Sequence, residues 1–148
     1  IAALSSSSID YAAVPTEILA PLAELRDALW ERQGGAPPLT IADCPALRHA
    51  GRATSARGGR VVAVSLAQPV AHVLCQVLHE ETHVVTDPLV RAQWSAEGPP
   101  RDTAAGSAGY ERHRALEMAA VEVGEALIAA RAPRWLDAYH RWRARYGV

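Results

Sequence analysis

Cysteine, net charge and long apolar runs are all scarce in this 148-residue chain. Two cysteines, Cys44 and Cys75, are too few for a disulfide framework, so we expect reduced thiols and a cytoplasmic protein. A net charge of −1 provides no basic footprint for nucleic acid. No apolar stretch reaches the roughly 18 residues that a membrane span needs. No signal peptide is visible, but the chain begins at Ile1 without a methionine, so a trimmed targeting segment stays open.

The composition is that of a globular protein. Hydrophobic residues make up 49% of the chain and charged residues 21%, and the length suits one domain with one core. The run from Ile1 to Ser8 contains four serines in a row and predicts a flexible end, which we place at residues 1–14. Residues 15–148 are expected to form a single α+β domain, with helices packed on a small β-sheet.

Hydrophobic periodicity predicts where the helices and strands lie. Apolar residues at helical spacing or β-branched runs indicate helices over residues 16–33, 68–86, 110–130 and 133–146, and strands over 39–41, 47–54 and 61–66. The two later strands are expected to pair as a hairpin. Gly34-Gly35 is expected to end the first helix, and Asp87-Pro88 the second. Residues 97–109, rich in proline and glycine, are expected to be a loop.

The most informative feature is the segment His79-Glu80-Glu81-Thr82-His83, which reads H-E-x-x-H. Residues four apart lie on one face of a helix, so His79 and His83 can bind a single Zn²⁺. Glu80 can reach a water on that metal without binding the metal, and can act as the general base of a hydrolysis. The preceding residues 69–78 are strongly apolar, which places the two histidines on a buried helix.

The third ligand decides the type of site, because a catalytic zinc usually has three protein ligands and an open fourth position. A metzincin would continue to a glycine and a further histidine, but Thr86 and Leu89 stand at those positions. Asp87 lies one turn beyond His83 and is near enough in sequence to approach the metal. Pro88 predicts a helix end there, which favours a capping role for Asp87.

Two glutamates of the helix expected at residues 110–130 are the other candidates. Glu122 lies on a stripe with Glu111 and Glu125, which is typical of a solvated helix face. Glu117 lies among small and apolar residues, where a buried carboxylate must be paired or bound to a metal. Gly124 on that face costs about 1 kcal/mol in a helix interior, which close packing against the motif helix would justify. We therefore prefer Glu117 to Glu122.

His113, one turn before Glu117, is a candidate catalytic residue. An imidazole there can donate a hydrogen bond to an oxyanion or orient the ligand, and the alternative of an ordinary surface histidine stays open. Tyr110 is a weaker candidate for the same donor role.

These residues resemble the gluzincin metallopeptidases, in which the H-E-x-x-H helix precedes a glutamate on a later helix. The segment from Glu117 to Gly124 looks like the E-x-x-A-x-x-F-A segment of ImmA/IrrE-type proteins, small bacterial domains whose members cleave repressors or relatives. Val123 replaces the aromatic residue of that pattern, and Gly124 the alanine. The resemblance covers about residues 60–130. It implies a zincin-like minimal metallopeptidase fold, in which the strand at residues 61–66 is an edge strand that holds an extended substrate.

The residues and the resemblance together predict zinc-dependent hydrolysis of a peptide bond in an extended peptide or protein substrate. Zn²⁺ would be bound by His79, His83 and Glu117, with Glu80 as general base and His113 as a second catalytic residue. The alternative is a non-catalytic zinc-binding scaffold or protein-interaction module that keeps the motif for stability. The oligomeric state is left open.

Overall fold

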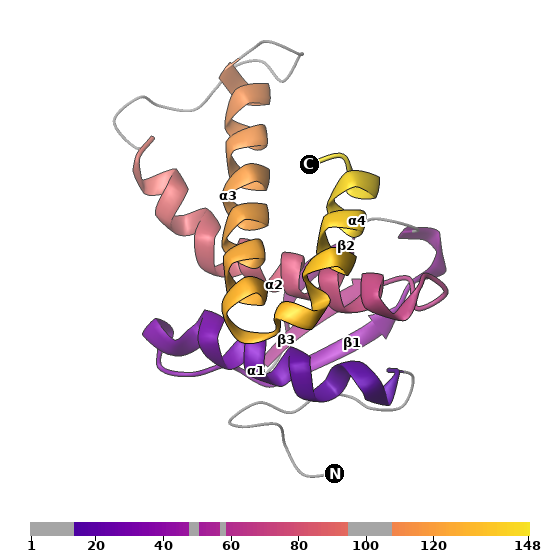
Figure 1. Ribbon diagram of the computed structural model, residues 1–148. Coiled ribbons are helices and arrows are strands. Elements are labelled where there is room, and N and C mark those ends of the chain that lie inside the picture. The colour runs from indigo at the N-terminus through magenta and orange to yellow at the C-terminus, as the bar shows by residue number, and fades with distance from the viewer. Residues whose placement is uncertain (1–13, 48–50, 57–58, 95–107) are drawn as a thin grey trace.

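The computed structural model describes residues 14–47, 51–56, 59–94 and 108–148, and it combines helices with one small sheet (Figure 1). This is the α+β class expected from the sequence. The segment expected to be flexible, residues 1–14, lies outside the described residues except for Val14, which is buried in the core. The loop expected at residues 97–109 lies outside them up to residue 107, and a helix begins at Ala108.

Three strands form the sheet in the order β1-β3-β2. Strand β1 (Leu39–Asp43) runs parallel to β3 (Gly59–Val64), and β2 (Gly51–Ala56) runs antiparallel to it. The expected hairpin pairing of the two later strands is confirmed. The expectation that the strand at residues 61–66 lies at an edge is wrong, because β1 and β2 pair with both sides of β3.

Three of the helices follow the predicted segments closely. The first consists of α1 (Leu19–Trp30) between two short 3-10 turns, and it ends at Gly34, whose φ of 88° is in the left-handed region that glycine adopts readily. Helix α3 spans Ala108–Arg131. Helix α4 (Leu136–Tyr146) follows the 3-10 turn Pro133–Trp135.

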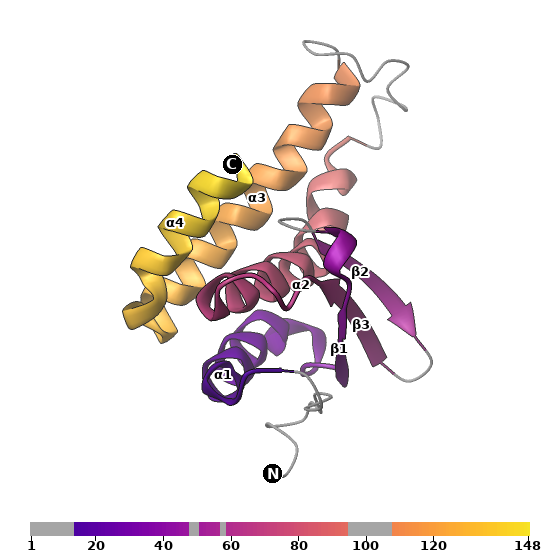
Figure 2. The same cartoon turned by 90° about the vertical axis from the view of Figure 1, so that its right-hand side faces the viewer.

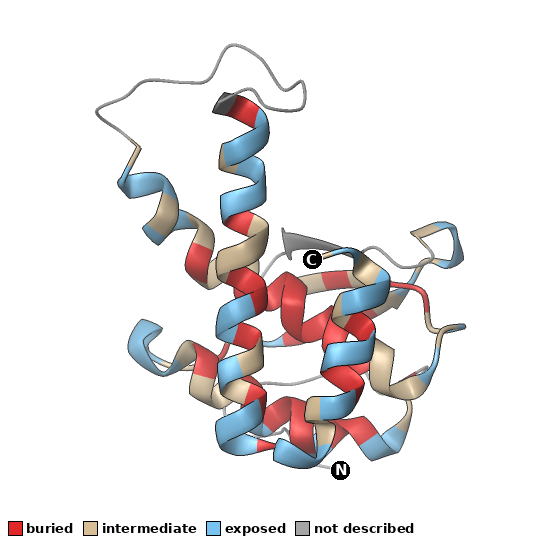
Figure 3. Ribbon diagram, turned by 45° about the horizontal axis from the view of Figure 1, so that its top comes forward, coloured by how far each residue is buried: buried red, intermediate tan, exposed pale blue. Residues whose placement is uncertain are grey.

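Helix α2 (Val70–Ala92) carries the H-E-x-x-H motif and lies at the centre of the molecule. Figure 2 shows it between α1 and the sheet on one side and the pair α3 and α4 on the other. All residues from 73 to 82 on α2 are buried, which Figure 3 shows as a continuous buried stretch. Because neighbours cover α2 on several faces, its side chains have few alternative positions, and this rigidity benefits any site built on it.

The expected end of α2 at Asp87-Pro88 is wrong, because the helix continues through Pro88 to Ala92. A proline inside a helix removes one hydrogen bond, here to the carbonyl of Val84, and bends the axis. Pro88 itself is exposed, so water can satisfy that carbonyl. The later turns of α2 point away from the direction of its first part (Figure 2). Asp87 is therefore an internal helix residue and not a cap.

Both cysteines are free in the structure. Cys75 is buried on α2 and Cys44 is half-buried after β1. Among the described helices, none combines the length and the apolar character that a membrane crossing requires.

Candidate metal centre

The two histidines of the motif and one glutamate of α3 meet beside the packed α2–α3 interface. His79 and His83 lie one turn apart on α2, and their Nε2 atoms are 3.1 Å apart. Glu117 brings its Oε2 atom to 3.1 Å from the His79 Nε2 atom and its Oε1 atom to 3.1 Å from the His83 Nε2 atom. The three side chains therefore converge on one point from two helices, and together they could hold a metal ion.

The spacing of these atoms suits a small tetrahedral ion. Ligand atoms held about 2.0–2.1 Å from a tetrahedral Zn²⁺ lie roughly 3.3–3.4 Å apart, close to the 3.1 Å between the two imidazole nitrogens and to the 3.1 Å contact of each with a different oxygen of Glu117. Two imidazoles and one carboxylate are also the donor set of a three-ligand catalytic zinc site. The residues present could therefore hold such an ion between the two helices.

Each histidine is held by its surroundings. The His83 Nδ1 atom lies 2.8 Å from the Asp87 Oδ1 atom, so Asp87 fixes the ring orientation and tautomer that present Nε2 to the centre. His79 is fully buried, and the rings of Trp142 and Tyr146 lie 5.1 and 4.9 Å from it. Its Nδ1 atom has no hydrogen-bond partner among the described residues, so aromatic packing and the contacts of Nε2 orient this ring.

The protonation states reflect the closeness of these groups. Burial opposes the charged form of Glu117, but hydrogen bonds with His79 and His83 outweigh burial and hold its pKa well below the usual range. Burial also opposes the charge on His83, but hydrogen bonds with Glu117 and Asp87 outweigh burial and raise the pKa of His83 to about 9. In the metal-free protein His83 is therefore protonated near neutral pH, and its positive charge partly replaces the charge that a metal ion would supply.

Glu80 lies beside the three converging residues with its own anchor. The side chain is 8% exposed, and its Oε2 atom accepts a hydrogen bond of 3.0 Å from the Gln76 amide. Gln76 in turn accepts a hydrogen bond of 3.0 Å from the Trp142 indole N–H. Burial raises the pKa of Glu80, while His79 and other neighbours oppose the rise. Trp142 and Gln76 thus fix one carboxylate oxygen and leave the other, Oε1, without a hydrogen bond to either of them.

The second glutamate of the motif points elsewhere. Glu81 forms a fully buried ion pair with Arg26 of α1, whose guanidinium also donates to the Pro37 carbonyl at 2.7 Å. Successive helix residues are about 100° apart around the axis, so the two glutamates face different surroundings. Glu80 reaches the centre, and Glu81 joins α2 to α1.

An open cleft of about 580 Å³ borders the centre. Glu80, His83 and Glu117 line it, together with His113 of α3 and Tyr146 of α4. Three protein groups converge here, and the space next to them is accessible from solvent. A fourth ligand position can therefore be filled by water or by a substrate atom.

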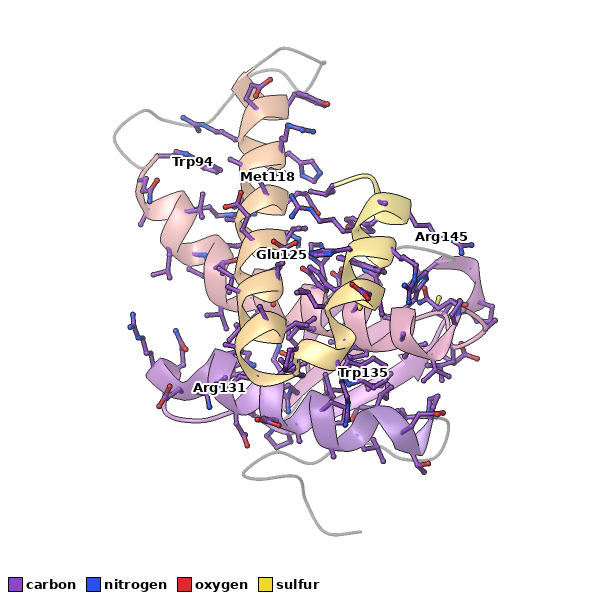
Figure 4. All side chains as sticks on the ribbon, in the orientation of Figure 1. Trp94, Met118, Glu125, Arg131, Trp135 and Arg145 are labelled. Atoms are coloured by element: carbon purple, nitrogen blue, oxygen red, sulfur yellow. The ribbon has the colours of Figure 1, made fainter. Side chains whose placement is uncertain are left out.

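The structure brings together His79, His83 and Glu117, the three ligands preferred from the sequence, and places the two alternative third ligands outside this group. Glu122 is exposed, away from the histidines, and Asp87 contacts His83 instead of joining the three converging groups. Glu111 is exposed, as expected for the solvated stripe. Glu125 is half-buried between α3 and α4 (Figure 4), where it pairs with His140 and Arg143, so its expected position in solvent is wrong.

The side chains that could donate a hydrogen bond to a bound substrate lie at different distances from the cleft. His113 lies on the wall of the cleft, and its ring is exposed. Tyr110 is 39% exposed and does not line this cleft. Tyr146, which the sequence reasoning overlooked, lines the cleft from α4, and burial together with the charges of Glu117 and Glu80 raises its pKa. A protonated hydroxyl beside the centre can donate a hydrogen bond.

Gln76, Trp142, Arg26 and Tyr146 also support the centre, and sequence reasoning did not find them. Gln76 precedes Glu80 by four residues on one helix, and this spacing could have identified it. The other three come from α1 and α4, and no local pattern links them to the motif. Comparison of the chain with protein-family models, curated proteins and solved structures found no match. Any functional assignment therefore depends on the site itself.

Proposed function

We propose that this protein is a zinc-dependent peptidase of the gluzincin kind, with a zincin-like minimal fold. The observation that carries the proposal is the convergence of His79, His83 and Glu117 at 3.1 Å separations beside an open cleft. Two imidazoles and a carboxylate favour Zn²⁺ over the oxygen-preferring ions Mg²⁺ and Ca²⁺. The free thiols of Cys44 and Cys75 suit a reducing compartment such as the cytoplasm.

The chemistry follows from the groups around the fourth position. Zn²⁺ held there would supply a Lewis acid that makes water acidic enough to react near neutral pH. Glu80 would accept the proton of the attacking water at Oε1 and deliver it to the leaving amine. Because Gln76 holds the other oxygen, the accepting oxygen has a fixed direction. Tyr146 or His113 would donate a hydrogen bond to the oxygen of the attacked carbonyl.

The extended substrate is proposed to add to the sheet at β2. Strand β3 has no free edge, whereas β2 pairs with β3 on one side and is an outer strand of the described sheet. Arg60 of β3 lines the cleft, and Ser55 of β2 lies opposite Arg60 in the antiparallel pairing, so β2 is next to the strand that borders the cleft. Backbone hydrogen bonds along an outer strand hold a peptide independently of its sequence.

The alternative is a zinc-binding scaffold with no turnover. A structural zinc usually has four protein ligands, whereas three converge here and the adjoining space is a cleft. Glu80 also has no ligand role in the arrangement, and a scaffold would gain nothing from holding a buried carboxylate there. Both features favour catalysis over a scaffold.

Metal binding is tested with two matched substitutions on one helix. The wild-type protein should bind about one Zn²⁺, and Glu117→Gln should weaken binding by about 10–100-fold or more because a charged ligand is lost. Glu122→Gln makes the same chemical change at an exposed position and should leave affinity unchanged. Zinc is measured by mass spectrometry of dialysed protein. Equal loss in both variants would contradict the three-ligand centre.

Catalysis is tested with Glu80→Gln on the peptides cleaved in a broad screen. This variant should keep its zinc and lose about 10²–10⁴ in turnover, because the general base is removed and no ligand is. Equal turnover by the variant and wild type would exclude Glu80 as the base. A zinc-loaded wild type that cleaves none of the screened peptides would favour the scaffold.

A further inference from the structure

Helix α4 reaches the proposed general base through two side chains. The Trp142 indole N–H of α4 donates a hydrogen bond of 3.0 Å to the Gln76 Oε1 atom of α2. The Gln76 Nε2 atom in turn donates a hydrogen bond of 3.0 Å to the Glu80 Oε2 atom. Gln76 and Glu80 are four residues apart and therefore lie on one face of α2. The three side chains form a chain of hydrogen bonds that begins on α4 and ends beside the metal centre.

The direction of the Gln76 amide follows from the chemistry of its two neighbours. An indole nitrogen can only donate a hydrogen bond, and an ionised carboxylate can only accept one. If the amide were turned by half a rotation, its NH₂ group would face the indole N–H and its carbonyl oxygen would face the Glu80 carboxylate. Both hydrogen bonds would then be lost in the interior, where Gln76 is fully buried and unpaired polar groups are costly. Trp142 and Glu80 therefore favour the same orientation of the amide.

The ring of Trp142 has little freedom to move this donor. Trp142 is 2% exposed. Three rings pack against it, and their centres lie 5.1 Å away for His79, 5.2 Å for Tyr139 and 5.0 Å for Tyr146. A side chain in a close-packed interior keeps one low-energy rotamer. The neighbouring rings therefore fix the direction of the indole N–H.

We propose that Trp142 is a positioning residue for Glu80, which acts by fixing the orientation of the Gln76 amide. Without the indole N–H, the Gln76 carbonyl oxygen would lose its partner, and the amide could turn away from Glu80. The carboxylate would then adopt several orientations, and fewer molecules would hold it where it accepts the proton of the attacking water. The inference rests on the proposed peptidase function, because it assigns a further residue to the same reaction.

Trp142 also packs against His79, so its hydrogen bond and its packing must be tested separately. Trp142→Phe removes the indole N–H but keeps an aromatic ring beside the metal ligand. Gln76→Leu removes the acceptor of the indole N–H and leaves Trp142 itself unchanged. Trp135→Phe is the matched control, because the Trp135 indole N–H has no hydrogen-bond partner among the described residues. Trp135 lies just before α4, at the end of the helix away from Arg145 (Figure 4).

The hydrogen bonds are tested by NMR of isotope-labelled protein, which requires no turnover. In Gln76→Leu, the Trp142 indole N–H resonance should move upfield and exchange faster with water, because its acceptor is gone. Trp142→Phe should move the resonances of the Gln76 side-chain amide, and Glu80→Gln should move the same resonances from the other end of the chain. Trp135→Phe should leave them in place.

The effect on the reaction is measured with a double-mutant cycle on a peptide that the wild type cleaves. Trp142→Phe should lower kcat about 10-fold, less than the roughly 10²–10⁴-fold loss expected on removal of the base. KM should change little, because Trp142 is not among the residues that line the cleft. In the Gln76→Leu background, Trp142→Phe should lower kcat by less than about twofold further, since the residue through which it acts is gone.

Three results would overturn the inference. A Trp142 indole resonance that does not move in Gln76→Leu would show that the first hydrogen bond is absent, and this arm needs no Trp142 variant to fold. An equal loss of kcat from Trp142→Phe with Gln76 or with leucine at that position would show that Trp142 acts by packing alone. A kcat of Trp142→Phe equal to that of the wild type would show that Glu80 does not need this anchor.

The inference and the proposed function fail in different ways. If the NMR shifts occur as expected but zinc-loaded wild type cleaves no peptide, the positioning of Glu80 is supported and the peptidase is contradicted. If wild type cleaves a peptide and Trp142→Phe cleaves it equally fast, the peptidase is supported and the role of Trp142 is contradicted.

Discussion

Zinc affinity should depend on pH through His83. The imidazole must be neutral to bind a metal, and in the metal-free protein the pKa of His83 is raised to about 9. Zinc therefore competes with a proton at every pH below 9. This competition should weaken the apparent affinity about tenfold for each unit below pH 9, or about 100-fold at pH 7, which corresponds to about 2.7 kcal/mol. Glu117, with its lowered pKa, stays ionised throughout this range.

The dependence is measured by competition with a chelator of known proton affinity between pH 6.5 and 10. The logarithm of the zinc affinity should rise with pH with a slope of at least one below pH 9. Above pH 9 His83 is neutral, so its contribution to this slope should disappear. Asp87→Asn removes one of the hydrogen bonds that raise the pKa of His83, so it should move this break to lower pH. An affinity that becomes flat near pH 6.5, the ordinary histidine value, would refute the reasoning.

The same shift predicts how the metal-free protein responds to pH. The pKa of His83 is about 9 in the folded state against 6.5 for an ordinary histidine, so its proton stabilises the fold. This stabilisation is fully present below pH 6.5 and is lost as pH rises to 9. The shift corresponds to about 3 kcal/mol as an upper bound, since His83 is 16% exposed. Urea denaturation of chelator-treated protein should show lower stability at pH 9.5 than at pH 6.5, and zinc should remove the difference.

Three further substitutions test the packing around the centre. Gly124→Ala should lower the free energy of unfolding by about 1–3 kcal/mol, although alanine favours helix more than glycine does, because the new Cβ would lie 2.5 Å from the Tyr139 hydroxyl. In a Tyr139→Phe background, urea denaturation should show that the same substitution costs little. Gln76→Leu should keep zinc but lower turnover, because Glu80 loses its anchor; unchanged kcat would contradict this role. Arg26→Met should cost about 3–5 kcal/mol, because it leaves a buried carboxylate unpaired; a loss below 1 kcal/mol would contradict the ion pair.

The sequence predicted the parts of the site that local rules determine. His79 and His83 follow from helical spacing, and the apolar run before them placed them on a buried helix, as α2 is. Glu117 was preferred to Glu122 because its neighbours on the helix are small and apolar. Ala120 and Val121 of that face are indeed fully buried, whereas Glu122 is exposed. Burial patterns along one helix were therefore sufficient to distinguish the two glutamates.

The predictions that were wrong concern features that depend on contacts between segments distant in the sequence. β-branched residues predicted strand β3 but could not place it at the centre, because that position comes from its pairing with β1, where Arg60 lies opposite Leu39. Gly124 was expected to allow close packing against α2, but the side chain that approaches it is Tyr139 of α4. Pro88 was expected to end α2, but an exposed proline near a helix end removes only one hydrogen bond.

The motif H-E-E-T-H depends on partners that the motif itself does not contain. Glu80 and Glu81 are adjacent and both buried, and each would be unfavourable there without a specific contact. Glu81 has Arg26 of α1, which neutralises it inside the protein. Among the described residues, Glu80 accepts its side-chain hydrogen bond from the neutral Gln76 amide at Oε2, which leaves Oε1 for the proposed proton transfer. If Glu80 were paired directly with an arginine, as Glu81 is, the guanidinium would occupy its carboxylate and make it a weaker base. The contrast between a charged and a neutral partner thus favours the proposed roles, in which Glu81 stabilises the fold and Glu80 acts as the general base.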